Sequence, residues 1–129
     1  MLSILVKIKE TLILLIRLYK IAIAQKQAEV FPGWSKTISR IRAVAKEEKT
    51  DPDLAVRVAR CESNFKNTAM NVISSASIDR GLFQWNSYWH PEISDKCAFD
   101  IECSTRAFCQ AVKDGHLNWW DCSKSCWQK

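Results

Sequence analysis

The sequence predicts an α+β domain that is mostly helical, carries a small irregular antiparallel sheet, and is preceded by an N-terminal amphipathic helix. Apolar residues recur at helical spacing through three stretches before residue 64, with chain breakers between them. From residue 67 to residue 88 that spacing stops, and polar residues cluster before an isolated glycine, which is typical of loops and short strands. All six cysteines follow residue 60, so any cross-links belong to the C-terminal half.

Composition limits the range of functions. A chain of 129 residues suits one domain, and 47% hydrophobic with 26% charged residues excludes a disordered tail. The formal net charge of +5 fits an anionic partner such as a cell wall or a membrane surface. No run of like charge is long enough for a nucleic-acid-binding arm, so we expect no nucleic-acid partner.

The first helix is predicted over residues 2–28, within a distinct segment at 1–30. Five basic and two acidic residues give that segment a net charge of +3. Its longest uncharged stretch between Glu10 and Arg17 has six residues, too few for a membrane span, and the residue order is wrong for a cleavable signal peptide. One helical face carries an apolar stripe of Leu5, Ile8, Leu12, Leu15, Ile16, Tyr19 and Ile23.

This stripe leaves two interpretations of the first helix open. An amphipathic helix in a membrane interface or on a partner would keep Lys9, Arg17 and Lys20 toward the headgroups. A helix docked on its own domain, or self-associating, fits the pattern equally well. The sequence carries no signal for an oligomeric state.

Two helices follow a breaker at residues 31–33. The second is predicted over 34–48, with apolar residues at helical spacing. Asp51 is a good N-cap and Pro52 a good first residue for the third, at 52–63. Glu62 borders the apolar stripe of that third helix.

The C-terminal half is predicted to hold loops and a small sheet, followed by one more helix. Gly81 is expected to serve a turn or a close backbone approach. Residues 97–103 are predicted to form a loop bounded by cysteines, and Ser104 to cap a helix ending at Gly115. Disulfides are the first interpretation of the cysteines, with zinc at Cys122 and Cys126 and free thiols as alternatives.

Two carboxylates stand out chemically. Glu62 lies at the apolar edge of a helix near its C-terminal end, where burial and the helix dipole both disfavour the charged form. Such an environment raises the pKa, which suits a general acid, although a Glu that faces solvent at a helix end is the alternative. Asp79 follows in a polar segment, and two carboxylates in contrasting environments are the pattern of glycoside hydrolysis.

Two strings of residues carry a family resemblance. Residues 62–65 read E-S-N-F, and residues 77–87 read S-I-D-R-G-L-F-Q-W-N-S. They resemble the lysozyme superfamily, both the soluble lytic transglycosylase domain, with Glu-Ser and Gly-Leu-x-Gln-x-Asn, and the animal-type lysozymes, with their spacing of Glu and Asp. The resemblance covers about residues 36–120 and implies a lysozyme-like fold for a catalytic domain at 34–129.

The resemblance implies roles for individual residues. Glu62 matches the acid that protonates the glycosidic oxygen, and Ser63 the serine that helps to hold substrate. Gln84 and Asn86 match polar residues that line or brace the site. Asp79 matches the second carboxylate of the animal-type enzymes, a residue that the transglycosylases often lack.

Two residues depart from the family patterns. Arg80 stands where the animal enzymes usually carry an aromatic residue, and its charge is expected either to keep Asp79 ionised or to divert it into a structural ion pair. Cys61, directly before Glu62, does not match the cysteine pattern of the animal enzymes, so their disulfide pairing does not transfer.

Aromatic side chains after residue 84 are candidates for stacking on sugar rings, with core packing as the alternative for each. We expect Trp85, Tyr88 and Trp119 to bind substrate, and Trp89 and Trp120 are further candidates.

The activity implied by the resemblance is cleavage of the β-1,4 bond between N-acetylmuramic acid and N-acetylglucosamine in peptidoglycan. Both hydrolysis and transglycosylation need Glu62, so the sequence does not separate them. The alternatives are a catalytically silent carbohydrate- or protein-binding module and a basic membrane-active protein. A peptidoglycan strand is the expected partner, with a possible membrane surface at residues 1–30. No metal or cofactor is expected, and the location is extracellular or in the cell envelope.

Overall fold

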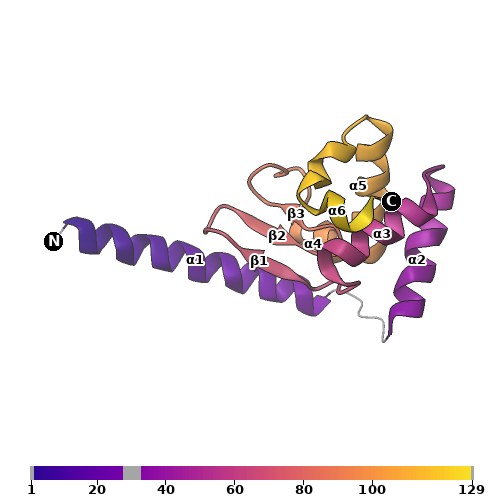
Figure 1. Ribbon diagram of the computed structural model, residues 1–129. Coiled ribbons are helices and arrows are strands. Elements are labelled where there is room, and N and C mark those ends of the chain that lie inside the picture. The colour runs from indigo at the N-terminus through magenta and orange to yellow at the C-terminus, as the bar shows by residue number, and fades with distance from the viewer. Residues whose placement is uncertain (1, 28–32, 129) are drawn as a thin grey trace.

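A computed structural model describes residues 2–27 and 33–128 (Figure 1). One long helix, α1, runs along the domain and projects beyond it at the N-terminal end, while the remaining helices gather on the other side of a small sheet. This architecture is mostly helical with one small antiparallel sheet, which confirms the predicted fold class. The elements in chain order are α1 (Leu2–Gln27), α2 (Trp34–Glu47), α3 (Pro52–Ser63), β1 (Met70–Val72), β2 (Ile78–Arg80), β3 (Trp85–Asn86), α4 (Asp95–Phe99), α5 (Ile101–Lys113), the 3₁₀ helix η1 (Leu117–Ser123) and α6 (Lys124–Trp127).

The helix that carries Glu62 begins as its sequence predicts. The Asp51 side chain accepts a hydrogen bond from the Asp53 backbone N–H, and Pro52 occupies the first turn, where its missing N–H costs nothing. α3 ends after Ser63, because Asn64 adopts a left-handed conformation with φ of 52°. Glu62 therefore lies in the last turn of α3.

The sheet has the order β1-β2-β3, and both strand pairs are antiparallel. Its register sets Asp79 on the central strand directly opposite Asn71 on β1 and Asn86 on β3. Gly81 follows β2 with φ of 77°, and a Cβ atom there would lie 1.8 Å from the Ala98 carbonyl oxygen. Both expectations for Gly81, a turn and a close backbone approach, are confirmed.

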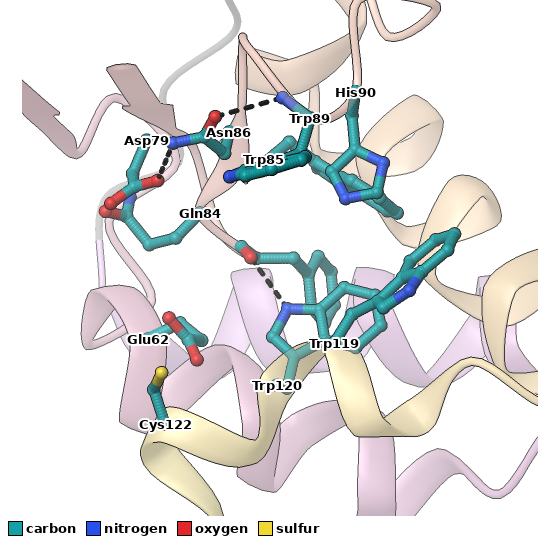
Figure 2. A pocket seen from close by; sticks show the side chains of 11 residues that line it. Glu62, Asp79, Gln84, Trp85, Asn86, Trp89, His90, Trp119, Trp120 and Cys122 are labelled. Carbon is teal, nitrogen blue, oxygen red and sulfur yellow. Dashed lines mark hydrogen bonds between the residues drawn. The ribbon is translucent and has the colours of Figure 1, made fainter. Parts of the chain in front are cut away.

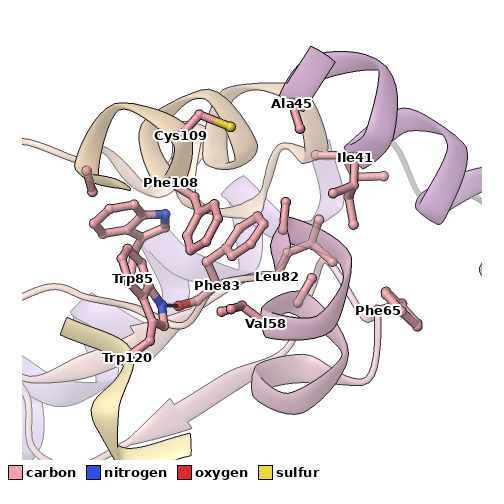
Figure 3. Packing of buried hydrophobic residues seen from close by; sticks show 14 of the residues in the cluster. Ile41, Ala45, Val58, Phe65, Leu82, Phe83, Trp85, Phe108, Cys109 and Trp120 are labelled. Atoms are coloured by element: carbon pink, nitrogen blue, oxygen red, sulfur yellow. Dashed lines mark hydrogen bonds between the residues drawn. The ribbon is translucent and has the colours of Figure 1, made fainter. Parts of the chain in front are cut away.

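The hydrophobic core lies between α2, α3, α5 and the C-terminal segment, by which we mean η1 and α6 (Figure 3). Phe83 and Phe108 stack at its centre, with ring centroids 4.5 Å apart. The indole N–H of Trp120 donates to the Phe83 carbonyl oxygen at 2.8 Å, which satisfies the one polar group that this ring buries. The core thus joins the C-terminal segment to the turn that follows β2.

The prediction for residues 97–103 is wrong. Instead of a loop, the segment spans the end of α4 and the start of α5, and a disulfide between Cys97 and Cys103 links the two helices. Ser104 is not a cap either: Asp100 caps α5 by accepting from the Cys103 backbone N–H. The Ser104 side chain is buried in the first turn and donates to the Asp100 carbonyl oxygen, which a serine inside a helix commonly does.

The cysteines are only partly paired. Besides the bond between Cys97 and Cys103, a disulfide joins Cys61 on α3 to Cys126 on α6. Cys109 is a buried free thiol and Cys122 an exposed one. Since Cys126 is bonded to Cys61, it does not join Cys122 in a zinc site.

The C-terminal half of α1 packs against the domain. Ile21 is fully buried and contacts Ile78 and Phe99. Arg17, which we expected to face lipid headgroups, instead forms a two-pronged ion pair with Asp95. The breaker predicted at residues 31–33 lies mostly outside the described residues, and the division of the chain into segments 1–30 and 34–129 stays a prediction.

Candidate active site

A cavity of about 530 Å³ lies between the last turn of α3, the sheet and the C-terminal segment (Figure 2). Its two predicted carboxylates come from opposite sides, Glu62 from α3 and Asp79 from β2. Aromatic rings form much of the remaining wall. The lining residues are Glu62, Asp79, Phe83, Gln84, Trp85, Asn86, Trp89, His90, Trp119, Trp120 and Cys122.

Glu62 has the environment of a general acid. Burial of its carboxyl raises its pKa above the ordinary value, a hydrogen bond from Ser123 acts in the opposite direction, and the negative charge of Asp79 adds to the rise. The Ser123 hydroxyl lies 2.5 Å from Glu62 Oε1 and 3.2 Å from the Trp120 carbonyl oxygen. A hydroxyl so placed can donate to the ionised carboxylate, or accept from the protonated one while donating to the carbonyl.

The disulfide beside Glu62 holds this contact in place. Cys61 directly precedes Glu62, and its partner Cys126 lies three residues after Ser123. The bond therefore ties the end of α3 to the C-terminal segment next to the hydrogen bond between Glu62 and Ser123. Ser123 gave no sequence signal, because this contact spans 61 residues of chain.

Asp79 is held by the two residues opposite it in the sheet. The Asn86 side-chain amide donates to Asp79 Oδ1 at 2.9 Å, and the Asn71 amide donates to Oδ2 at 3.4 Å. The Asn86 amide is also 3.0 Å from the Ser77 hydroxyl, which helps to orient it. These donors fix the direction of the Asp79 carboxylate toward the cavity.

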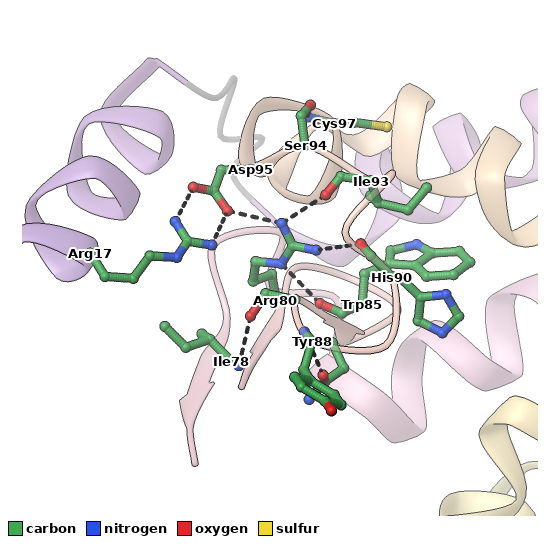
Figure 4. A network of polar contacts seen from close by, with 12 residues as sticks. Arg17, Ile78, Arg80, Trp85, Tyr88, His90, Ile93, Ser94, Asp95 and Cys97 are labelled. Atoms are coloured by element: carbon green, nitrogen blue, oxygen red, sulfur yellow. Dashed lines mark hydrogen bonds and ion pairs between the residues drawn. The ribbon is translucent and has the colours of Figure 1, made fainter. Parts of the chain in front are cut away.

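Arg80 does not pair with Asp79, so the expectation that it diverts this carboxylate into an ion pair is wrong, while the expectation that its charge keeps Asp79 ionised stays a prediction. Neighbouring strand residues point to opposite faces of a sheet, and Arg80 therefore points away from the cavity. Its guanidinium is 2% exposed and lies 2.9 Å from Asp95 Oδ1, which also accepts from Arg17 (Figure 4). Arg80 therefore does not compete with Glu62 and Asp79 for a place in the cavity.

Arg80 instead supports one wall of the cavity. Its guanidinium donates to the carbonyl oxygens of Trp85 at 3.0 Å and Ile93 at 2.9 Å, and lies 3.5 Å from that of His90. Trp85 and His90 both line the cavity. A buried cation that binds several carbonyls of one loop restricts the loop's backbone.

The aromatic lining divides into buried and accessible rings. Trp85 and Trp120 are buried and belong to the core, although both also border the cavity. Trp89 is 73% exposed and Trp119 45% exposed, and both border the cavity. Trp119 keeps this exposed surface although His116 stacks on its ring, with centroids 4.3 Å apart.

The predicted site residues are only partly brought together. Six line the cavity, while two do not: Tyr88 points to solvent, and the Ser63 hydroxyl donates to the Ala59 carbonyl oxygen within α3. The six are Glu62, Asp79, Gln84, Trp85, Asn86 and Trp119.

Gln84 braces the turn between β2 and β3. Its backbone is left-handed, with φ of 53°, which is uncommon for a residue with a side chain. The side-chain amide donates to the Gly81 carbonyl oxygen at 2.9 Å and holds the turn closed. A strained residue kept in place by its own hydrogen bonds is typical of functional sites.

The cavity also contains residues that the sequence did not single out for it. Cys122 lies beside Glu62 as an exposed thiol, and His90 lies against the rings of Trp85 and Trp119. A lone cysteine or histidine carries no local pattern, so only the fold places these residues here. Within residues 2–27 and 33–128, no three metal-ligating side chains are grouped closely enough to hold an ion.

Comparison with known proteins agrees with this geometry. No curated protein and no solved structure matches the chain. A family model described as a lysozyme-like domain matches residues 40–123, which include both carboxylates, the three strands and most of the C-terminal segment. That range is more than half of the chain, so the resemblance noted in the sequence is confirmed, and the chain belongs to the lysozyme-like domain family.

Proposed function

We propose that this protein is a peptidoglycan-cleaving glycosidase that acts on the β-1,4 bond between N-acetylmuramic acid and N-acetylglucosamine. The observation that carries the proposal is Glu62, a partly buried carboxyl with a raised pKa, facing Asp79 across a cavity with exposed aromatic rings. Membership of the lysozyme-like domain family supports the same substrate class. A silent binding module has no use for a desolvated acid at this position.

Glu62 supplies the first proton in the proposed reaction. In its protonated form it donates to the glycosidic oxygen, the bond to the anomeric carbon breaks, and the leaving sugar departs with that proton. Positive charge develops on the anomeric carbon, and the negatively charged Asp79 on the opposite wall stabilises it. The Ser123 hydroxyl stabilises the ionised form of Glu62 that results, because it can donate a hydrogen bond to the carboxylate once the proton has left.

Hydrolysis is the better supported of the two possible outcomes. In hydrolysis, Glu62 takes a proton from water as the water adds to the anomeric carbon; in transglycosylation, the muramoyl 6-hydroxyl takes that place. The family's transglycosylases often lack a second carboxylate, whereas Asp79 is present here and oriented by Asn71 and Asn86. Arg80 does not neutralise it.

Mass analysis of digested peptidoglycan tests the outcome directly. Hydrolysis gives reducing-end sugars, and transglycosylation gives 1,6-anhydro products. Predominantly anhydro products would overturn the hydrolytic assignment.

The test of the acid is Glu62→Gln, with Glu47→Gln as matched control. Loss of the general acid should reduce the rate of wall cleavage by about 10²–10⁴-fold. Glu47 is exposed on α2 and remote from the cavity, so its substitution should leave the rate unchanged. Binding to insoluble peptidoglycan should persist in Glu62→Gln, which separates lost chemistry from lost binding. Retention of more than about a tenth of the activity would refute the assignment.

We also propose that the protein acts outside the cytoplasm, at the cell envelope or beyond it. Two observations support this location: the disulfides, which persist in oxidising compartments, and the substrate that the family favours. Fractionation of the producing cells, with thiol labelling to detect the oxidised cysteines, tests the location. Recovery of reduced protein in the cytoplasm would contradict it.

A further inference from the structure

α1 has two faces of different character. The face toward the domain carries Ile21, which is fully buried, together with residues one turn away on either side. Two polar contacts fix this face: Arg17 pairs with Asp95, and the Gln25 side-chain amide donates to the Thr68 carbonyl oxygen at 2.8 Å. α1 is therefore attached to the domain along one side of its C-terminal half.

The apolar stripe predicted from the sequence lies on the other side. At 100° per residue, Leu12 and Tyr19 are about half a turn around the helix from Ile21. Every member is between 41% and 69% exposed, although all are large apolar side chains. We call this set the outer stripe: Leu5, Ile8, Leu12, Leu15, Ile16, Tyr19 and Ile23.

The domain does not cover the outer stripe. α1 projects past the sheet at its N-terminal end, and the rest of the fold lies on the side of Ile21 (Figure 1). A contiguous apolar surface of this length is more than a soluble monomer usually exposes, so it indicates a binding surface. Within the described residues, no helix is long and apolar enough to cross a membrane.

The charges of α1 favour an anionic partner over a second copy. Lys9 and Lys20 border the outer stripe, Lys26 follows it, and Glu10 is the single acidic residue of the helix. A lipid bilayer with anionic headgroups complements this arrangement, because apolar side chains enter the acyl boundary while lysines reach the headgroups. Two copies packed through their stripes would bring these lysines together, and the like charges would repel.

We propose that the outer stripe of α1 binds the surface of an anionic lipid bilayer and holds the domain there, with α1 lying in the interface. Arg17 and Gln25 contact the domain from the opposite face of α1. Binding of the outer stripe to a membrane therefore leaves these contacts intact, and the domain stays attached to α1. The proposal does not depend on the glycosidase activity, since it needs no residue of the cavity.

Sedimentation of the full chain with vesicles tests this surface. Vesicles of phosphatidylcholine with a quarter phosphatidylglycerol should bind the protein, and pure phosphatidylcholine should bind it more weakly, by roughly fivefold for each lysine that reaches the headgroups. Equal binding to both vesicles, or binding to neither, would overturn the proposal.

Two matched double variants locate the surface. Leu5→Gln with Leu12→Gln removes two residues of the outer stripe, and Val6→Gln with Ile13→Gln removes two similarly exposed residues beside it. Both pairs have the same spacing and leave the net charge unchanged. The stripe pair should weaken vesicle binding by at least about tenfold, while the control pair should stay within about threefold of the wild type.

Two further measurements separate this proposal from its rivals. Both double variants should keep the unfolding midpoint and the activity on soluble wall fragments, so that a lost glycosidase function and a lost membrane surface are told apart. Light scattering without vesicles should give a monomer. Equal loss of vesicle binding in both pairs, or a dimer that only the stripe pair dissociates, would refute the membrane assignment.

Discussion

Substitution of Asp95 should destabilise the fold far more than its position on a short helix suggests. Asp95 Oδ1 lies 2.9 Å from Arg80 and 2.8 Å from Arg17, so one carboxylate neutralises two guanidinium groups. Asp95→Asn keeps the size of the side chain and removes the charge. The side chain of Arg80, which is 2% exposed, then stays buried beside the positive charge of Arg17, without the carboxylate that neutralised both guanidinium groups.

The expected cost is about 3 kcal/mol in the free energy of unfolding. Breaking a buried ion pair from one side costs about 3–5 kcal/mol, and the lower end applies because Arg80 keeps its bonds to the carbonyls of Trp85 and Ile93. The free energy of unfolding of a domain of this size is about 5–15 kcal/mol, so the expected loss is a large fraction of it. Urea unfolding followed by tryptophan fluorescence at pH 7 measures it.

The same contact predicts how stability depends on pH. The hydrogen bond from Arg17, with a further contribution from Arg80, holds the pKa of Asp95 below its ordinary value despite the opposing effect of burial. A carboxyl whose pKa is lower in the folded state stabilises the fold above its unfolded pKa and loses that contribution as the pH falls through the folded value. The difference between wild type and Asp95→Asn should therefore shrink below about pH 4.

Asp53→Asn is the matched control, because Asp53 forms an exposed ion pair with Arg42. Exposed pairs contribute little, so this variant should unfold almost like the wild type. If Asp95→Asn is no more destabilising than Asp53→Asn, the buried network does not support the fold as argued.

Three further predictions concern the site and the first helix. Asp79→Asn should slow wall cleavage by at least about a hundredfold without changing the unfolding midpoint, and a small effect would return the assignment to transglycosylation. Ser123→Ala removes the hydrogen-bond donor to ionised Glu62, so the pKa of Glu62 should rise further. The alkaline limb of the pH–rate profile should then move to higher pH. A limb that does not move would contradict a role for this hydrogen bond. A chain that begins at Phe31 should fold and cleave soluble wall fragments. Its unfolding midpoint should be lower than that of the full chain, because the contacts of Ile21 are lost. Failure to fold would place α1 within the catalytic domain.

The helices before residue 64 and the position of Glu62 could be predicted from the sequence because their signals are local. Asp51 and Pro52 mark the start of α3 within two residues, and the apolar spacing that follows places Glu62 at the edge of the buried face. The cap at Asp100 was missed for a physical reason. Ser104 has the same local chemistry as a cap, and only tertiary packing shows which of the two residues begins the helix.

The partners of the site residues could not be predicted in the same way. Ser123 reaches Glu62 across 61 residues, and Asp95 reaches Arg17 across 78. Such contacts depend on how the elements pack, which neither periodicity nor capping encodes. Tyr88, which the aromatic composition suggested as a sugar-binding ring, is exposed but does not line the cavity, so its role stays a prediction.

The register of three short strands decides which charge faces the cavity. Asp79 and Arg80 are neighbours on β2, and strand alternation sends the carboxylate toward Glu62 and the guanidinium toward Asp95. A slip by one residue would exchange them and place a cation where positive charge develops in the proposed reaction. Gly81 opposes such a slip, because its N–H donates to the Ala69 carbonyl oxygen at 2.8 Å and its missing Cβ lets the Ala98 carbonyl approach. The substitution Gly81→Ala should therefore disturb the site by shifting the strand register, although it replaces neither of the two carboxylate residues.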